Sequence, residues 1–199
     1  MISVDGHAGF SPEFMITNRG RWSEVSVSDL ARWANVSYPQ SPGEVDWSGV
    51  PVELRALLPD DYMEMIDTFG GGTFDRHIWI HSPGRQGEPY DLASCVVERE
   101  MALEFLWSTG EEIPVEINRG SGRLIVWAST GDGEYIYWLA SGKEPFPTFP
   151  RIAVQSYDGD WEFFDFSCTE FLLRWVKGEL ETNLISTAFA EFGNSFIRY

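Results

Sequence analysis

A series of short β-rich runs in the second half of the chain constrains its fold more than any other sequence feature. The runs are residues 113–117, 123–128, 134–139, 152–157 and 161–166. Gly131-Asp132-Gly133 separates two of them, and Asp158-Gly159 separates two others. Both are typical tight-turn sequences, because glycine and aspartate tolerate the positive φ angles that hairpin turns require. Hairpins join antiparallel neighbours, so this half of the chain predicts an antiparallel β-sheet.

Helical patterns lie before the β-rich runs in the chain. Residues 52–58 predict a short helix, and Pro59 begins a second one, because a proline in the first helical turn loses no hydrogen bond. The apolar side of the second helix recurs at near-helical spacing, as Leu58, Tyr62, Ile66 and Phe69. The glycines at 70–72 end it, since glycine accepts the left-handed conformation of a helix C-cap. Residues 74–81 then alternate as one strand.

Two further helices are predicted around the sheet. Residues 95–107 form the longer one, in which Val97, Met101 and Phe105 recur every four residues. The last helix begins at Ser167-Cys168-Thr169-Glu170, a capping-box pattern in which the serine and glutamate side chains accept from each other's backbone amides. Its predicted buried side is Phe171, Leu172, Trp175 and Val176, with Gly178 near the end.

The first 45 residues follow a less regular pattern. Residues 19–33 are compatible with a short helix begun by Ser28, and Trp22 and Trp33 are expected to pack this stretch on the rest of the chain. The order of helices, strands and a closing helix predicts one α+β domain. We expect a single domain, with an antiparallel β-sheet of about five to six strands packed against helices.

The chain is strongly acidic, with 31 Asp and Glu against 14 Lys and Arg and a formal net charge of −17. Residues 152–170 contain five acids and no Lys or Arg, and residues 53–67 contain five acids and one base, Arg55. Such charge repels nucleic-acid phosphates and attracts basic proteins, although acidity also serves solubility alone. We therefore expect a basic protein partner and no nucleic acid.

The sequence also bears on the cellular compartment. No apolar run approaches the roughly 20 residues that span a bilayer, and residues 1–10 lack the basic and then apolar pattern of a secretory signal. Cys95 and Cys168 are too few for a disulfide framework, so we expect reduced thiols. We expect a cytoplasmic protein without a membrane partner.

The histidines do not indicate a metal site. His77 and His81 share one predicted strand and point to the same face, but four residues of strand span about 13 Å, too far for both to bind one ion. We expect them at solvent-facing or rim positions.

Nucleophile and calcium motifs are also missing. Cys95 and Cys168 begin predicted helices, where a thiolate is favoured, but neither lies in a known nucleophile signature, so core thiols are the better interpretation. The acids at 158, 160 and 162 lack the twelve-residue loop of a calcium site. The sequence therefore shows no catalytic constellation and predicts neither an enzyme nor a metal site.

Three segments resemble the SUKH superfamily. The first is Leu58-Pro59-Asp60-Asp61-Tyr62, followed by Phe69-Gly70-Gly71-Gly72-Thr73-Phe74. The second spans residues 124–134 and continues with Tyr137-Trp138; Ala128 replaces the usual glycine there and Glu134 the usual aspartate. The third, residues 165–180, is similar to the final helix of the family.

The resemblance covers residues 47–180 and implies an α+β fold without a cofactor. The superfamily contains bacterial toxin-immunity proteins and relatives of yeast cell-wall-synthesis regulators. We expect an N-terminal extension at 1–45, a SUKH-like domain at 46–182 and a C-terminal tail packed on it at 183–199. The resemblance implies structural roles for Pro59, Asp61, Tyr62, Gly70, Gly71, Trp127, Gly133 and Trp138.

We therefore expect an immunity protein that neutralises a cognate toxin by direct capture, the toxin being a basic, nucleic-acid-targeting protein. The expected contact acids lie at or beside the two hairpin turns and are Asp132, Glu134, Asp158, Asp160 and Glu162. Two alternatives remain open: a regulatory or scaffold protein without a toxin partner, and a small hydrolase that uses carboxylates. A toxin gene next to this one would favour the immunity interpretation.

Overall fold

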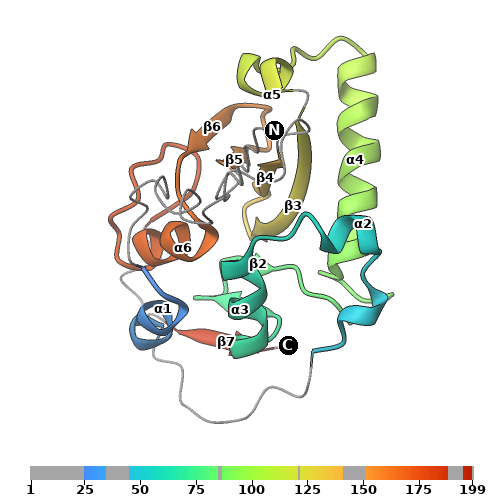
Figure 1. The fold of residues 1–199 in the computed structure, drawn as a ribbon. Coiled ribbons are helices and arrows are strands. Elements are labelled where there is room, and N and C mark those ends of the chain that lie inside the picture. Colours follow the sequence, from blue (N-terminus) through green and yellow to red (C-terminus); the bar gives the residue numbers. More distant parts are fainter. Residues whose placement is uncertain are drawn as a thin grey trace, which may run out of the picture.

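An antiparallel sheet forms the centre of the molecule (Figure 1). The computed structural model describes residues 25–34, 45–84, 87–120, 122–140, 151–187 and 195–198. Within these residues seven strands lie in the order β6-β5-β4-β3-β2-β1-β7. The strands are β1 (Gly72–Phe74), β2 (Ile78–Ile80), β3 (Arg123–Thr130), β4 (Tyr135–Ala140), β5 (Arg151–Gln155), β6 (Trp161–Phe164) and β7 (Phe196–Arg198). The predicted single α+β domain with an antiparallel sheet is confirmed, with more strands than expected.

The two predicted hairpins are present. β3 pairs with β4 and β5 with β6, both antiparallel, and Gly133 and Gly159 in their turns have φ angles of 107° and 93°. The register of β3 shifts between Val126 and Ala128. Trp127 therefore occupies a β-bulge, which turns its side chain toward the core.

The expected single strand at 74–81 is wrong, because the chain reverses within it. Residues 72–74 and 78–80 form β1 and β2, which pair antiparallel with Phe74 opposite Ile78. Asp75 and Arg76 make the turn, with φ angles of 48° and 55°. Aspartate tolerates a positive φ angle, but the pair lacks the glycine of an Asp-Gly hairpin turn, so the sequence gives only a weak turn signal here.

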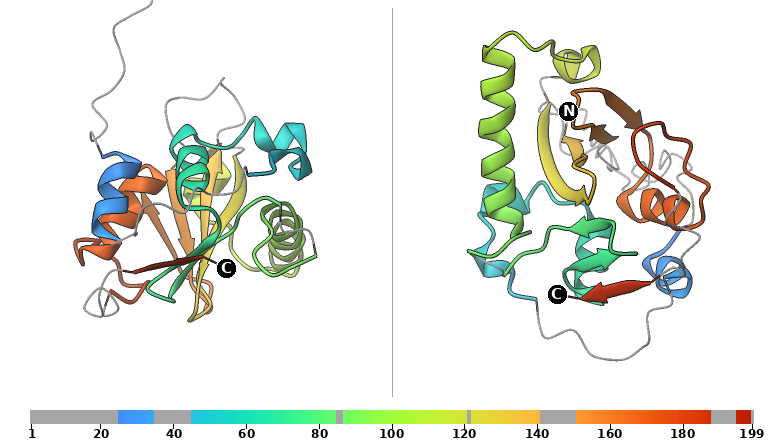
Figure 2. Two further views of the ribbon diagram at one scale, coloured as in Figure 1. Left: turned by 90° about the horizontal axis from the view of Figure 1, so that it is seen from below. Right: turned by 180° about the vertical axis from the view of Figure 1, so that it is seen from behind.

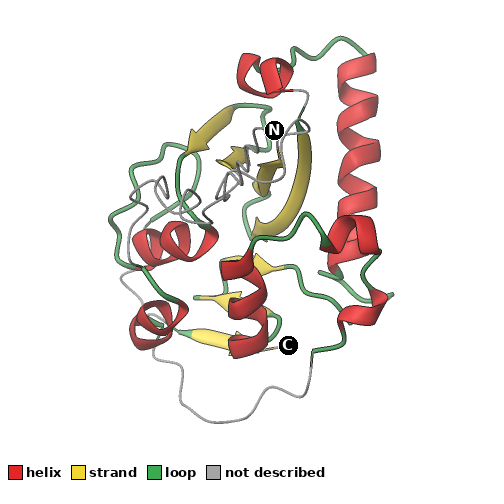
Figure 3. Cartoon of the chain, viewed as in Figure 1, coloured by secondary structure: helices red, strands yellow, loops and turns green. Residues whose placement is uncertain are grey.

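Helices cover both faces of the sheet (Figure 3). The α-helices are α1 (Val27–Trp33), α2 (Val52–Arg55), α3 (Asp60–Phe69), α4 (Leu92–Ser108), α5 (Val115–Gly120) and α6 (Cys168–Val176), and Trp47–Gly49 form a 3₁₀ turn. Pro59 is the N-cap of α3 and Gly70 its C-cap, as the sequence predicts within one residue. α4 begins earlier than expected, because the Asp91 carboxylate accepts from the Ser94 amide and caps it.

The two faces of the sheet bury different elements. Trp127 and Trp138 stack on one face with ring centroids 5.5 Å apart, and the ring of Tyr62 from α3 meets Trp138 edge-on. Neighbouring residues of a strand point to opposite faces, so Tyr137 lies on the other face. There its hydroxyl accepts from Arg99 of α4. Accordingly α4 lies across the sheet from α6 and α1 (Figure 2).

The predicted strand at 113–117 is also wrong. The Pro114 carbonyl accepts from the amides of Ile117 and Asn118, so the chain enters α5 directly after this proline. Proline is compatible with a helix start, and here this local geometry overrides the β preference of isoleucine and valine.

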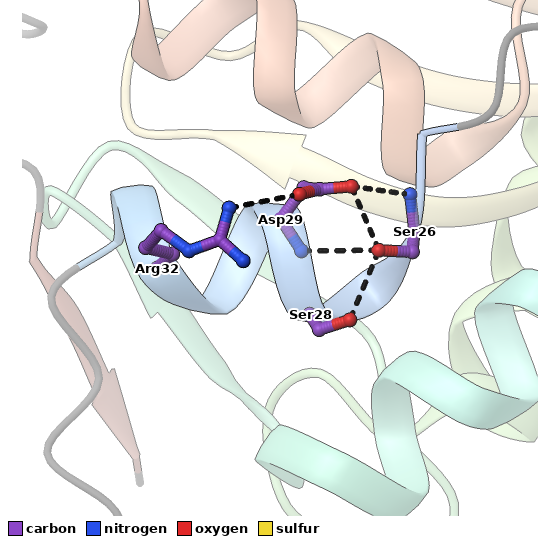
Figure 4. Close-up of polar contacts among 4 residues, drawn as sticks. All are labelled: Ser26, Ser28, Asp29 and Arg32. Carbon is purple, nitrogen blue, oxygen red and sulfur yellow. Dashed lines mark hydrogen bonds and ion pairs between the residues drawn. The ribbon is translucent and has the colours of Figure 1, made fainter.

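α1 begins two residues before the predicted start. Ser26 is its N-cap: its hydroxyl accepts from the Asp29 amide, and the Asp29 carboxylate accepts from the Ser26 amide (Figure 4). Val27, Leu30 and Ala31 are buried, and α1 packs against α6 and α3.

Trp33 packs on the rest of the chain only in part. Its ring is 45 % exposed and lies 4.9 Å from the Lys177 ammonium. Trp22 lies outside the described residues.

α6 begins directly after Ser167, the predicted N-cap. The Ser167 hydroxyl accepts from the Glu170 amide, while the Glu170 carboxylate accepts from Arg174. Phe171, Leu172, Trp175 and Val176 are buried. Near the C-terminus, β7 pairs with β1 and places Phe196 against the ring of Phe74.

Candidate functional site

The motif residues between α2 and β1 connect elements that are distant in the chain. The Asp61 carboxylate accepts from the Thr169 amide at 3.0 Å and from the Cys168 thiol, so it holds the first turn of α6. The Tyr62 hydroxyl donates to the buried carbonyl of His81. Gly70 ends α3 with a φ of 74°. These residues therefore connect α3 to the start of α6 and to the chain after β2.

The two acidic turns lie next to each other at one end of the sheet. Tyr135 is opposite Gln155, and Gln155 is opposite Trp161, so the β3–β4 and β5–β6 turns emerge from the same end. A Cβ atom on Gly133 would lie 3.7 Å from the Cβ of Tyr157.

Three of the five expected contact acids are exposed there. They are Asp132, Asp158 and Asp160. These three carboxylates therefore share one exposed end of the molecule.

The other two expected contact acids form internal hydrogen bonds. Glu134 is only 8 % exposed and accepts from the Thr130 hydroxyl. Glu162 accepts from the Thr182 hydroxyl at 2.5 Å and from the Asn183 amide at 2.8 Å, which holds the segment after α6. Their position in the sequence beside a turn gave no sign of these partners.

The histidines are buried, which corrects the expectation of rim positions. Each is 2 % exposed, because packed aromatic rings cover the imidazoles. His77 stacks on Trp175 and its Nε2 lies 4.0 Å from a carboxylate oxygen of Asp132, while Nε2 of His81 lies 3.1 Å from the Ser129 hydroxyl.

Burial lowers the pKa of both imidazoles. The pKa of His81 falls to about 3, and that of His77 also falls, although Asp132 and Glu134 oppose the shift. Both are neutral at pH 7. Among the described residues, no three His, Cys, Asp or Glu side chains converge in a way that could hold a metal ion.

Both cysteines are poor nucleophiles in this fold. Burial, with Glu98 and Asp91 nearby, raises the pKa of Cys95 to about 11. Burial also raises the pKa of Cys168 well above its usual value, and the Asp61 carboxylate adds to the shift. Each thiol is therefore protonated at neutral pH, and neither is in a disulfide.

The outer face of α4 carries an unexpected apolar row. The exposed fractions are 57 % for Val97, 66 % for Met101 and 66 % for Phe105. The buried residues of the helix, Leu92, Val96 and Leu103, lie on its opposite side. The four-residue spacing is visible in the sequence, but the sequence does not show which side of this helix meets the sheet.

A groove of about 820 Å³ runs beside this row. One wall is α4, through Ala93, Val97 and Met101, and the opposite wall includes Val50 and Pro83. α4 stands at the margin of the molecule (Figures 1 and 2).

Two of the three acids of α4 border its outer face, while the third, Glu100, pairs with Arg123 of β3. Glu98 and Glu104 are exposed beside the apolar row. Arg99 instead points to the sheet, where its guanidinium lies 3.7 Å from the Tyr135 ring centroid and donates to Tyr137 and Gln155. The outer face is therefore apolar with acidic borders.

The chain was compared with family models, curated proteins and solved structures. No family model, curated protein or solved structure matches the chain. Within the part of the chain that the structure describes, no helix is both long and apolar enough to cross a membrane.

Proposed function

We propose that this protein is a binding module that captures a basic protein partner. The observation that carries the proposal is the exposed apolar row on α4 between acidic side chains. Soluble proteins seldom leave several large apolar side chains exposed side by side, except where another molecule covers them.

The proposed partner is a cognate bacterial toxin that targets nucleic acid, which this chain neutralises in the cytoplasm by direct capture. The resemblance of three ordered segments to the SUKH superfamily supports this choice. The net charge of −17 supports it as well, because an enzyme that handles phosphates presents a basic cleft.

The three exposed turn acids have a separate role in this proposal. Asp132, Asp158 and Asp160 lie together at one end of the sheet. Complementary charge raises the rate of association more than it lowers the rate of dissociation, and salt weakens the effect. We therefore assign them to steering the partner during encounter.

The first experiment is co-purification from the native cell, with and without the product of the neighbouring gene. Recovery of a basic toxin whose activity the chain blocks would support the proposal. Recovery of a component of a larger assembly, with no toxin gene nearby, would contradict the toxin proposal. It would favour the regulatory or scaffold alternative.

The second experiment measures association rates with the captured partner. Replacing Asp132, Asp158 and Asp160 with Ser should lower the association rate at low salt by about ten-fold and flatten its salt dependence. The matched control replaces three exposed acids elsewhere, Glu53, Glu64 and Glu179, with Ser. Equal rates for the two triple variants would contradict a specific steering role of the turns.

A further inference from the structure

The apolar row on α4 has the geometry of a helix-binding surface. Residues four apart on an α-helix are offset by about 40°, so Val97, Met101 and Phe105 form a nearly straight row about 12 Å long. Their exposure of 57 to 66 % leaves most of each side chain available for contact. An amphipathic helix can lay its own apolar row along such a surface.

The adjoining groove provides depth for side chains of the occupant. Its volume of about 820 Å³ falls within the range of clefts that bury most of a bound ligand. Its floor and walls include Val50, Pro83 and Ala93 in addition to the first two residues of the row.

The borders of this surface are acidic. Asp46 and Glu98 line the groove, and Glu104 lies beside the row on the next turn of α4. Asp46 is exposed and accepts from the amide and hydroxyl of Ser48, which lowers the pKa of its carboxyl and keeps it ionised. An occupant with positive charges beside its apolar side chains would complement these carboxylates.

The same charges disfavour other occupants. Two copies of this chain would each bring a net charge of −17 and place the acidic borders opposite each other. An anionic lipid surface would be repelled for the same reason. Residues 1–24 of the chain contain three acids and two arginines, so they do not supply a basic segment.

We propose that the groove beside α4 binds a basic amphipathic helix of the protein partner, with apolar residues three to four apart and Lys or Arg beside them. This inference deepens the proposed function, because it names the surface and the chemistry of the segment that the surface takes.

The test uses the full chain and a fluorescent 18-residue peptide with leucines at helical spacing and lysines elsewhere. A scrambled peptide of the same composition controls for charge alone. We expect saturable binding of the patterned peptide that is at least about ten-fold tighter than that of the scrambled one. Equal affinities would overturn the proposal, because they would show attraction by charge without recognition of the apolar row.

Matched variants locate the binding. Val97→Ser, Met101→Ser and Phe105→Ser together leave the charge unchanged and should weaken binding of the patterned peptide at least about ten-fold. Val52→Ser, at a 78 % exposed apolar side chain of α2, should leave it unchanged. Wild-type affinity in the triple variant would overturn the proposal, as would a wild-type dimer that the triple variant abolishes.

The two proposals fail separately. If the peptide binds at the groove but the protein captures no toxin, the groove proposal is supported and the toxin proposal is overturned. If the triple variant still captures the toxin, the groove proposal is overturned and the toxin proposal stands. Circular dichroism and urea unfolding of each variant establish that a loss of binding is not a loss of fold.

Discussion

Replacing Gly72 with alanine would test how β7 is held against the sheet. Gly72 lies in β1 opposite Arg198, and a Cβ atom there would lie 2.5 Å from the Ile197 carbonyl oxygen and would also meet the Phe196 ring. Real Cβ atoms do not approach the backbone this closely. Gly72→Ala should therefore force β1 and β7 apart.

Two responses to this substitution can be compared by their cost. Keeping β7 in place overpacks the site, which typically costs about 1–3 kcal/mol. Releasing β7 removes Phe196 from Phe69 and Phe74, whose ring centroids lie 5.3 and 4.8 Å from its own. Full burial of a phenylalanine stabilises by about 1.5–3 kcal/mol, and Phe196 is only partly buried. The less costly response sets the result, so we expect the free energy of unfolding to fall by about 2 kcal/mol.

The assay is urea unfolding, with hydrogen exchange as a local probe. The Asp75 amide donates to the Ser195 carbonyl beside β7, so its exchange should accelerate in Gly72→Ala. Gly49→Ala is the control, because a Cβ atom at Gly49 meets nothing within 4 Å, and its stability should change by about 0.5 kcal/mol or less.

Two results would refute the steric reasoning. One is an unchanged stability and exchange rate in Gly72→Ala. The other comes from truncating the chain after residue 194: if Gly72→Ala costs as much in the truncated chain as in the full one, the two changes are independent and β7 is not the cause.

Three further substitutions test the core contacts, each by urea unfolding. Tyr62→Phe removes the phenol donor from the buried His81 carbonyl and should cost about 1–3 kcal/mol, whereas Tyr157→Phe, on an 85 % exposed ring, should be near neutral. Asp61→Asn removes the charge that caps α6 and should lower the free energy of unfolding by about 1–2 kcal/mol. The control Asp60→Asn, at an exposed neighbour, should lower it by about 0.5 kcal/mol or less, and equal losses would refute the capping role of Asp61. Burial lowers the native pKa of His81 to about 3, while the unfolded chain takes up this proton near pH 6.5, so stability should fall as the pH drops below 6.5. His81→Asn should reduce that slope by up to about 1.4 kcal/mol per pH unit, and an unchanged slope would contradict a neutral native histidine.

The surface was predicted less well than the fold. The two acidic turns are visible in the sequence, and their common end of the sheet follows from antiparallel pairing. Glu134 and Glu162 were expected to contact a partner, but the folded chain supplies internal donors to both, from Thr130 and from the segment after α6. A donor 20 residues away cannot be inferred from local spacing.

Local chemistry in the sequence determined the elements whose signals lie within a few residues. Hairpin glycines, the N-cap at Ser167 and the stop at Gly70 act through hydrogen bonds and φ angles inside one turn, so the hairpins, α6 and α3 could be predicted. The turn at Asp75 and Arg76 could not, because aspartate without a following glycine is only a weak turn signal inside an alternating pattern.

Only the tertiary structure decided which side of each element is covered. α4 is apolar on more than one side, and the sheet buries the side of Leu92, Val96 and Leu103, which leaves Val97, Met101 and Phe105 outside. The histidines became buried for the same kind of reason, since the elements packed over β2 come from distant parts of the chain. Burial depends on partners brought together by the whole fold, and a periodic pattern indicates that a helix or strand forms without naming the face it will bury.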